Sequence, residues 1–407
     1  ASRLRTFDSG LLVFGTRNTF SERLGDPKRG VVPARDWIRA QFERIALTSG
    51  GRMTVALDEY DQPKTENTPR EARVSSVVAT LQGDDPSGRT YVMTSHYDSR
   101  NSDGNDITKD APGADDNGSG VSAVLEAARI MAPHRFKGTI IFAAYDGEEQ
   151  GLFGSGHHAK ALHDAGIPVI ANLNNDIMGS STAPDGKRDA FEVRLFSEAL
   201  APDATVKRIN SLGAENDSPS REIARFVKTA AQEYVPKMTA RLIYRSDRFL
   251  RGGDQQSFNA QGFAAVRFVE PHEDYRHQHQ DVRLEGGVPY GDLQKYVDFD
   301  YLARVTQMNV AALAALALGP ATPQHVEMRT KVLSYDTTLR WSAVPGAASY
   351  EILWRDTTQP LWEHVKNVGN VTQATVPVSK DDYLFGVRAV DKNGLASPAV
   401  FPVPVRE

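Results

Sequence analysis

Short apolar runs alternate with amphipathic stretches over the first three quarters of the chain. The apolar runs are rich in Val and Ile and span residues 74–81, 91–95, 139–145, 169–173 and 264–269. Helix-like spacing occurs before them, at residues 33–49, and between them, at residues 119–131 and 155–165. In the first of these stretches Ile38, Phe42 and Ile45 stand at i, i+4 and i+7. Apolar strands that alternate with amphipathic helices predict an α/β fold, a mostly parallel mixed sheet sandwiched by helices.

The pattern changes after a last helix-like stretch at 302–318, which ends at Gly319-Pro320 as helices commonly do. From about Thr322 the segments TLRWSAV, SYEILWR, QATVPV and YLFGVRAV alternate apolar and polar positions, with turn residues such as Asn393-Gly394 between them. We therefore expect two domains, an α/β domain at 1–319 and a small all-β sandwich at 322–407.

The C-terminal segment resembles a fibronectin type III domain. Trp341 in TLRWSAVPGAASYEILWR and Tyr383 in YLFGVRAVDKNGLASP stand where that family places its core tryptophan and tyrosine. We interpret these two residues, together with Tyr350 and Trp354, as aromatic side chains that pack between two sheets. The segment contains no recognisable catalytic set.

Composition narrows the classes of function. The 407 residues carry a formal net charge of -5 with interspersed signs, so we expect no nucleic-acid partner. The absence of cysteine excludes thiolate ligands, and any bound metal must be held by His, Asp and Glu. The most apolar helix-like run, 310–318, is too short for a bilayer, so we expect no membrane span. A chain that opens at Ala1 without a leader, together with the fibronectin-like segment, favours a secreted or periplasmic location.

Potential metal ligands follow four of the expected strands. They are His96 and Asp98, then Asp146, Glu148 and Glu149, then Asp176, and last the histidines of VRFVEPHEDYRHQHQD. Each group alone is commonly a solvated strand end. However, the carboxyl ends of strands in an open α/β sheet are where ligands bind, and four such groups favour one shared site.

The segment 113-GADDNGSG-120 adds two adjacent aspartates before an expected helix. One aspartate suffices for a helix cap, and two neighbouring carboxylates repel each other unless a cation neutralises them. Two cations that share a carboxylate, about 3.5–4 Å apart, would explain the whole set. Imidazole and carboxylate ligands suit zinc.

The ordered motifs HYDS, GADDNGSG, DGEEQGLFGS, NNDIMGS and HQHQD resemble those of the M28 zinc aminopeptidases, over residues 5–319. The resemblance implies two Zn²⁺ ions per chain. It assigns His96 and Asp176 to one zinc ion, Glu149 and His277 to the other, and Asp116 to both as a bridge. His277 is selected with Asp281 by the family's H-x-x-x-D spacing, ahead of His279 and His272.

The same resemblance gives two residues catalytic roles. Glu148, the first of the Glu pair, is the expected general base, and Asp98 is expected to orient the imidazole of His96 by a hydrogen bond. Tyr275 and Arg276 are alternatives for polarising the peptide carbonyl. Asp254 matches the aspartate of the family's D-H-x-x-F-x-x-x-G-x-P-A region, whereas Gln255 replaces its histidine.

Other polar residues near the motifs have simpler interpretations. Asp115 is read as a helix-capping or loop residue, and His157 and His158 as solvated or packing residues.

The expected activity is hydrolysis of the N-terminal peptide bond of peptides with a free amino terminus. A water bridging the two metals would lose a proton to Glu148 and attack the carbonyl carbon. The alternatives are a glutaminyl cyclase with one zinc ion, a carboxypeptidase or amidohydrolase of the same superfamily, and a non-catalytic binding protein.

Overall fold

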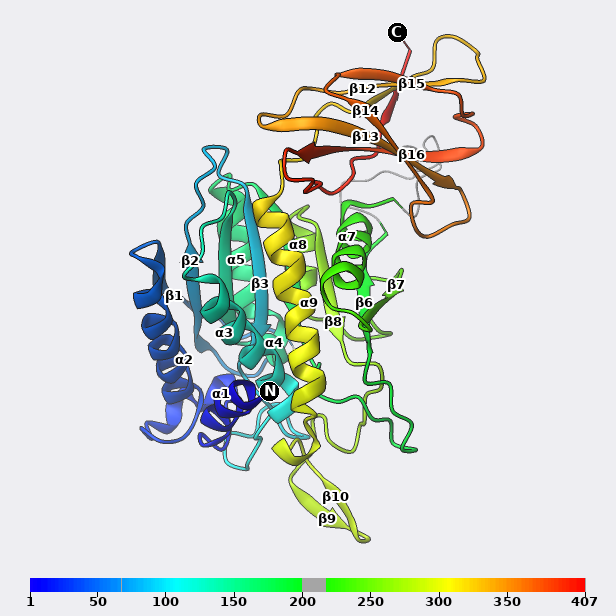
Figure 1. Cartoon of the computed structure of the whole chain (residues 1–407). Coiled ribbons are helices and arrows are strands. Elements are labelled where there is room, and N and C mark those ends of the chain that lie inside the picture. The colour runs from blue at the N-terminus through cyan, green and yellow to red at the C-terminus, as the bar shows by residue number, and fades with distance from the viewer. Residues whose placement is uncertain (67, 200–216, 407) are drawn as a thin grey trace.

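The structure is a computed structural model that describes residues 1–66, 68–199 and 217–406. Its larger part is a twisted sheet with helices on both faces, and a smaller β-rich part lies at one end (Figure 1). In the described part of the chain the large sheet has eight strands, in the spatial order β1-β2-β4-β3-β5-β8-β6-β7. Their bounds are β1 Met53–Gln62, β2 Ala72–Leu81, β3 Thr90–His96, β4 Thr139–Tyr145, β5 Val169–Asn175, β6 Glu192–Ser197, β7 Thr239–Ile243 and β8 Ala265–Val269.

Parallel pairing holds the centre of this sheet together. The strands β4, β3, β5 and β8 pair in parallel, and so do β6 and β7. Antiparallel pairing joins β1 to β2, β2 to β4 and β6 to β8. The expected fold class is thus confirmed, a large mixed sheet flanked by helices with smaller sheets at the C-terminal end.

Alternate residues of the central strands enter two separate cores. In β4, for example, Phe142 belongs to the core on one face of the sheet, whereas Ile141 belongs to the core on the other. The first face is covered by α1 (Ser2–Leu12), α2 (Val31–Ala46), α3 (Gly120–Met131), α7 (Pro219–Tyr234) and α9 (Phe299–Leu318). The second face is covered by α5 (Phe153–Asp164) and α8 (Gln255–Ala260), and Figure 1 shows α5 behind the sheet.

Shorter elements complete this part of the molecule. They are the one-turn helix α4 (Glu148–Gly151), the 3₁₀ helices η1 (Thr19–Leu24), η2 (Leu47–Ser49) and η4 (Gln294–Tyr296), the π-helical turn η3 (Ala114–Ser119), and a hairpin of β9 (Arg283–Glu285) and β10 (Val288–Tyr290).

The helix α9 is longer than the apolar run at 310–318 from which we expected no membrane span. Its 20 residues are long and apolar enough to cross a membrane by length and composition alone. Within the structure, however, Val305, Met308 and Leu313 are buried in the core against the sheet. Packing inside the protein therefore explains the apolar character of this helix.

The C-terminal part consists of two small sheets. In the described residues one sheet has the order β15-β12-β11-β17 and the other β14-β13-β16. Pairing is antiparallel except between β11 and β17. The bounds are β11 Glu327–Arg329, β12 Thr337–Arg340, β13 Ala347–Asp356, β14 His364–Gly369, β15 Gln373–Val376, β16 Tyr383–Asp391 and β17 Val403–Val405.

A single hydrophobic core joins the two small sheets. Leu339 comes from one sheet and Ile352 from the other, and Trp341 and Tyr350 are buried with them. Tyr383 and Trp354 are half-buried and pack against the same core, as we interpreted from the sequence. The specific resemblance to fibronectin type III stays a prediction, and so do the domain limits at 319 and 322.

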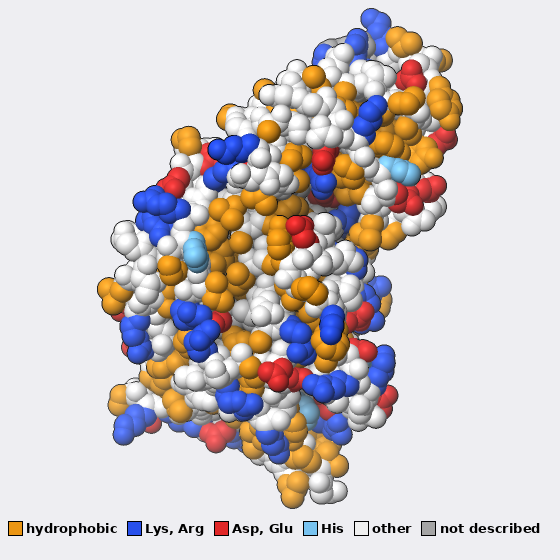
Figure 2. Space-filling view, viewed as in Figure 1, with side chains coloured by type: hydrophobic (Ala, Val, Ile, Leu, Met, Phe, Trp, Pro, Cys, Tyr) orange, Lys and Arg blue, Asp and Glu red, His pale blue; other side chains and the backbone are white. Residues whose placement is uncertain are grey.

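On the face drawn in Figure 2, Lys and Arg side chains lie interspersed with Asp and Glu side chains over the larger part of the molecule. That face has no large area covered by Lys and Arg side chains alone.

Candidate metal centre

A cluster of histidine and carboxylate side chains lies at the carboxyl ends of the central strands. His96 is the last residue of β3, Asp176 directly follows β5, and Glu148 and Glu149 begin α4 just after β4. Asp116 comes from η3, immediately before α3. Because β4, β3 and β5 are neighbours and parallel, their carboxyl ends meet at one edge of the sheet.

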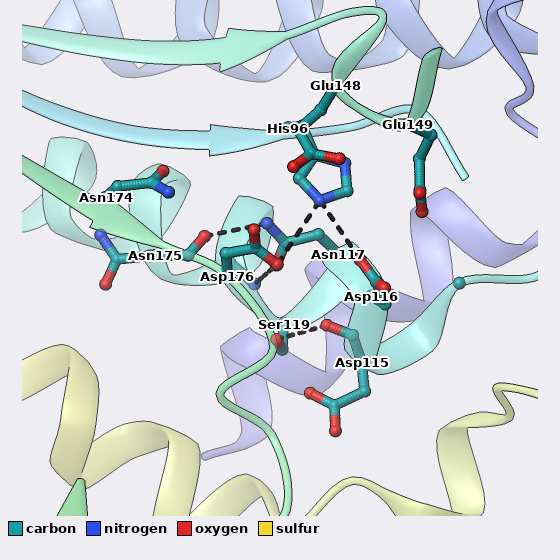
Figure 3. Close-up of polar contacts among 12 residues, drawn as sticks. His96, Asp115, Asp116, Asn117, Ser119, Glu148, Glu149, Asn174, Asn175 and Asp176 are labelled. Atoms are coloured by element: carbon teal, nitrogen blue, oxygen red, sulfur yellow. Dashed lines mark hydrogen bonds and ion pairs between the residues drawn. The ribbon is translucent and has the colours of Figure 1, made fainter. Parts of the chain in front are cut away.

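His96 lies at the centre of the cluster. Its Nε2 atom is 3.2 Å from Oδ1 of Asp116 and 3.6 Å from Oδ1 of Asp176. Figure 3 shows these two carboxyl groups pointing toward the same ring nitrogen from opposite sides. Ligand atoms of His96, Asp116 and Glu149 all lie within 4.8 Å of one another, and so do those of His96, Glu148 and Asp176.

His279, and not His277, reaches this cluster from the loop after β8. The Nε2 atom of His279 is 2.9 Å from Oδ2 of Asp116 and 3.0 Å from Oε2 of Glu149. The backbone of His279 has a φ of 52°, in the left-handed region that residues other than glycine rarely adopt. Such a conformation is typical of residues held in place at a functional site.

The ring of His277 points elsewhere, which corrects its placement in the site. It stacks on Tyr296, with 3.6 Å between the ring centroids, and its Nε2 atom lies 3.9 Å from the nearer oxygen of Asp274. Asp281, which selected His277 by spacing, instead accepts hydrogen bonds from Ser102 and Lys109. Asp281 thus bonds a neighbouring loop and, among the described residues, contacts neither His277 nor His279. The H-x-x-x-D spacing therefore does not identify the metal ligand here.

Asp98 is fully buried and contacts both sides of the cluster. The main-chain oxygen of Asp98 lies 3.2 Å from Nδ1 of His96, at hydrogen-bond distance, and its Oδ1 atom lies 3.4 Å from the same nitrogen, on the side of the ring away from Asp116. The same carboxylate accepts hydrogen bonds from the backbone N–H groups of Glu148 (3.2 Å) and Glu149 (3.1 Å). Asp98 therefore positions the Glu pair as well as the imidazole, a second task that the sequence did not reveal.

Asp292 holds the turn that carries Asp116. Its carboxylate accepts hydrogen bonds from the backbone N–H groups of Asp115 (2.8 Å) and Asp116 (2.7 Å). Sequence reasoning missed Asp292, because it lies far along the chain in a loop without a motif. The side chain of Asp115 points away from His96 and accepts a hydrogen bond from the N–H of Gly179, as expected of a loop residue (Figure 3).

A buried arginine, also missed from the sequence, lies behind Asp176. Arg267 of β8 is 1% exposed and contacts Oδ2 of Asp176 (2.9 Å) and Oδ2 of Asp247 (2.9 Å). Burial raises the pKa of Asp176, but the charge of Arg267 and the charge and hydrogen bond of His96 together outweigh it and lower that pKa below its ordinary value. Gln255 donates a hydrogen bond to the same Asp247, so it supports this arrangement from behind.

The electrostatics of the cluster favour bound cations. Burial lowers the pKa of His96, yet the charges of Glu148 and Asp176 raise it well above its ordinary value. In the same way Glu149 and Asp116 raise the pKa of His279 to about 10 despite burial. The surrounding carboxylates thus stabilise positive charge at both imidazoles, whether a proton or a bound cation supplies it.

The donor atoms fit metal ions. Oδ1 of Asp176 is buried and accepts no hydrogen bond from any described residue. Such an oxygen costs free energy unless a cation meets it. Imidazole nitrogens and carboxylate oxygens are ligands that suit zinc.

Other sequence candidates lie outside the cluster. His158 bonds the hydroxyl of Tyr145, and His157 stacks on Tyr60, which agrees with a packing role. Arg276 forms an ion pair with Asp274, and Tyr275 is 60% exposed.

A small pocket opens beside Asp116 and is strongly acidic. Asp115, Glu270 and Asp292 line it together with Asp116, and within the described part of the chain no Lys or Arg does. Burial raises the pKa of both Glu270 and Asp292 well above the ordinary value. Raised pKa values favour the neutral, protonated form of these two groups, and a positively charged group in the pocket would favour their ionised form.

Comparisons with known proteins identify the family of the chain. The sequence profile of peptidase family M28 matches residues 76–285. A protein of Leptosphaeria maculans named probable zinc metalloprotease is 47% identical over 99% of this chain and 95% of its own length.

Two solved structures share the fold. The Legionella pneumophila LapA aminopeptidase has a TM-score of 0.53 and 20% identity, over 78% of this chain and 70% of its own. The Porphyromonas gingivalis glutaminyl cyclase also has a TM-score of 0.53, with 17% identity over 77% of this chain and 96% of its own. Fold similarity alone does not choose between these two activities.

Proposed function

Because the chain belongs to peptidase family M28, we propose that it is a zinc-dependent aminopeptidase that removes the first residue of peptides with a free amino terminus. The observation that carries the proposal is the convergence of five metal-binding side chains from distant parts of the chain, with Glu148 beside them. These side chains are His96, Asp116, Glu149, Asp176 and His279.

We assign the ligands from the observed contacts. His96 and Asp176 would hold one zinc ion, Glu149 and His279 would hold the other, and Asp116 would serve both. When bound, the two ions would polarise the substrate carbonyl and lower the pKa of a water between them. Asp98 keeps the imidazole of His96 and the backbone of the Glu pair in position for this arrangement.

Glu148 is the proposed general base. Burial raises the pKa of its carboxyl group well above the ordinary value, with Asp176 and Glu149 adding to the effect. A carboxylate of raised pKa accepts a proton from the attacking water more readily and can return it to the leaving amine.

The acidic pocket supports specificity for an amino terminus. An exopeptidase must hold the charged end of the substrate within one residue of the bond it cleaves. The pocket that includes Asp116 is lined by Asp115, Glu270 and Asp292, so it offers oxygen acceptors for an ammonium group and, among the residues that the structure describes, no Lys or Arg that could pair with a terminal carboxylate. This favours an aminopeptidase over a carboxypeptidase.

A glutaminyl cyclase is the second candidate, because a structure of that name shares the fold. A cyclase with one zinc ion has no need of a second ligand set. Here His279 contacts the Asp116 oxygen that does not face His96, and it also contacts Glu149, which supports a second metal site.

A panel of substrates tests the proposal. Aminoacyl chromogenic amides, their N-acetylated forms and peptides with N-terminal glutamine should be offered to the purified protein with and without a chelator. We expect release from the free-amine substrates only, loss of activity with chelator, and recovery on adding zinc. Conversion of N-terminal glutamine to pyroglutamate without cleavage would instead support the cyclase.

A further inference from the structure

The surface has a second hollow, which is lined by arginines, whereas the pocket beside Asp116 is lined by carboxyl groups. This second hollow has a volume of about 510 Å³ and is bordered by β6, the end of β7 and the segment 244–251. We call it the arginine groove. Its lining includes Arg194, Arg245, Arg248 and Arg251, together with the exposed rings of Phe249 and Tyr275.

The positive charges of the arginine groove are only partly balanced. Glu273 forms ion pairs with Arg194, Arg248 and Arg251, so one carboxylate serves three guanidinium groups. Arg248 also contacts Asp247, which is already paired with Arg267. Within the described residues Arg245 has no ion pair, and its guanidinium carbon lies 3.8 Å above the ring of Phe249.

One side chain connects the arginine groove to the metal cluster. Gln278 accepts a hydrogen bond from Nη1 of Arg251 (3.0 Å) and donates one to Oδ2 of Asp116 (2.9 Å). A peptide whose first bond lies at the cluster therefore needs few further residues to reach the arginines, since each extended residue spans roughly 3.3–3.6 Å.

We infer that the arginine groove binds a carboxylate of the peptide substrate on the carboxyl-terminal side of the cleaved bond. The inference rests on the proposed aminopeptidase function. The ammonium group of the substrate would lie in the acidic pocket and its carboxylate at the guanidinium groups of the arginine groove. Charges of opposite sign at the two places would then orient the peptide. The carboxylate comes from acidic side chains at the third and fourth positions or from the free carboxyl terminus of a short peptide.

Kinetics on matched tetrapeptides test the inference. The peptides are X-Ala-Glu-Glu and X-Ala-Gln-Gln, each as free acid and as amide, where X is the first residue that the chromogenic panel favours, or Ala if no substrate is turned over. We expect kcat/KM to be roughly tenfold higher for each added carboxylate that reaches a guanidinium group. The amides isolate the glutamate side chains, and the free acid of the Gln peptide isolates the terminal carboxylate.

The variant Arg245→Gln should reduce the preference for the peptides with added carboxylates, and Arg245→Glu should abolish it. Neither variant should change kcat/KM for the neutral chromogenic amide. Arg135→Gln and Arg135→Glu are the matched controls, because Arg135 is exposed outside the groove and pairs only with Asp84 among the described residues. A preference kept by Arg245→Glu, or absent from the wild-type enzyme, would overturn the inference.

Calorimetric titration separates this inference from the proposed function. The same peptides are titrated into the Glu148→Gln protein, which prevents turnover, and into its Arg245→Glu derivative. Tighter binding of the Glu peptide that is lost with Arg245→Glu supports the groove even if no peptide is hydrolysed. Equal binding of the Glu and Gln peptides refutes it, whatever the activity.

Discussion

Glu148 and Glu149 are adjacent in the sequence but have different surroundings. The carboxylate of Glu149 lies 3.0 Å from His279, whereas Glu148 lies with His96 and Asp176 on the other side of the cluster. We therefore expect Glu148→Gln to lower kcat by about 10²–10⁴-fold, the usual share of a general base, and to leave the zinc content unchanged. Turnover of an aminoacyl amide and elemental analysis measure the two effects. Near-native turnover with full zinc content would contradict the role of Glu148.

The two histidines of HQHQ offer a direct contrast. His279 contacts Asp116 and Glu149, while His277 stacks on Tyr296. The variant His279→Ala should retain about one zinc ion per chain where the wild-type protein holds two, and His277→Ala should retain both. Equilibrium dialysis followed by elemental analysis gives the counts. Loss of zinc from His277→Ala alone would return the ligand role to His277.

Residues that end buried strands were the predictable part of the candidate site. His96 and Asp176 follow apolar runs, so their positions at one edge of the sheet could be read from the sequence. The choice between His277 and His279 could not, because both lie in a loop without periodicity. The contacts of His279 with Asp116 and Glu149 and the stacking of His277 on Tyr296 decide it. Likewise, no local pattern connects Arg267 with Asp176.

At the scale of elements, burial and an unbroken apolar run together decided what could be predicted: the inner strand β6 was missed, because Glu192 and Arg194 interrupt its segment EVRLFS. The central strands β2, β3, β4, β5 and β8 are almost fully buried, and their continuous apolar runs predicted them. The edge strand β1 was missed, because its segment MTVALDEYDQ is mostly half-exposed and carries charged residues. The other edge strand, β7, is short and also largely half-exposed. An edge strand pairs with only one other strand and exposes more of its side chains to solvent. Its sequence is therefore as polar as that of many loops.

The helix α1 carries a buried carboxyl group that makes stability depend on pH. Asp8 is fully buried, accepts a hydrogen bond from Gln294, and burial raises its pKa to about 7. An aspartate with a raised folded pKa contributes its stability below its unfolded pKa near 4, and loses it as the pH rises through about 7. The change is roughly 1.4 kcal/mol per pKa unit, so a few kcal/mol in all.

The variant Asp8→Asn should remove this part of the pH dependence. We expect the difference in free energy of unfolding between wild type and variant to shift in favour of the variant between pH 4 and 7. Urea unfolding at a series of pH values gives the difference. A difference that stays constant over that range would show that Asp8 does not titrate there.

At the scale of the molecule, the C-terminal sheets lie away from the metal centre. They lie near the amino ends of the central strands, where Lys137, just before β4, pairs with Asp391 of β16. The candidate metal ligands lie at the opposite, carboxyl ends of the same strands, as Figure 1 shows by the position of α4. We therefore expect the C-terminal part to affect stability more than chemistry. Export from the cell stays a prediction from the sequence.

A buried group of charges fastens the C-terminal sheets to α7. Arg355 of β13 and Arg225 of α7 both bind Asp217, and Glu222 accepts hydrogen bonds from Trp362 and from the N–H of Ala399. Removing one partner of such a group leaves an uncompensated buried charge, at a cost of about 3–5 kcal/mol.

The variant Arg355→Met should therefore lower the free energy of unfolding by that amount, with kcat/KM unchanged. Arg388→Met is the matched control, because Arg388 pairs with Glu351 at the surface of the same sheet and should cost less than about 1 kcal/mol. Denaturant unfolding compares them. Equal stability of the two variants would show that the buried charges do not join the two parts.

The central claim is that two zinc ions share Asp116, and anomalous diffraction at the zinc absorption edge tests it most directly. We predict two peaks about 3.5–4 Å apart. One should lie against His96 and Asp176, the other against Glu149 and His279, with an oxygen of Asp116 facing each. A single peak, or none within reach of these five side chains in zinc-saturated crystals, would contradict the account.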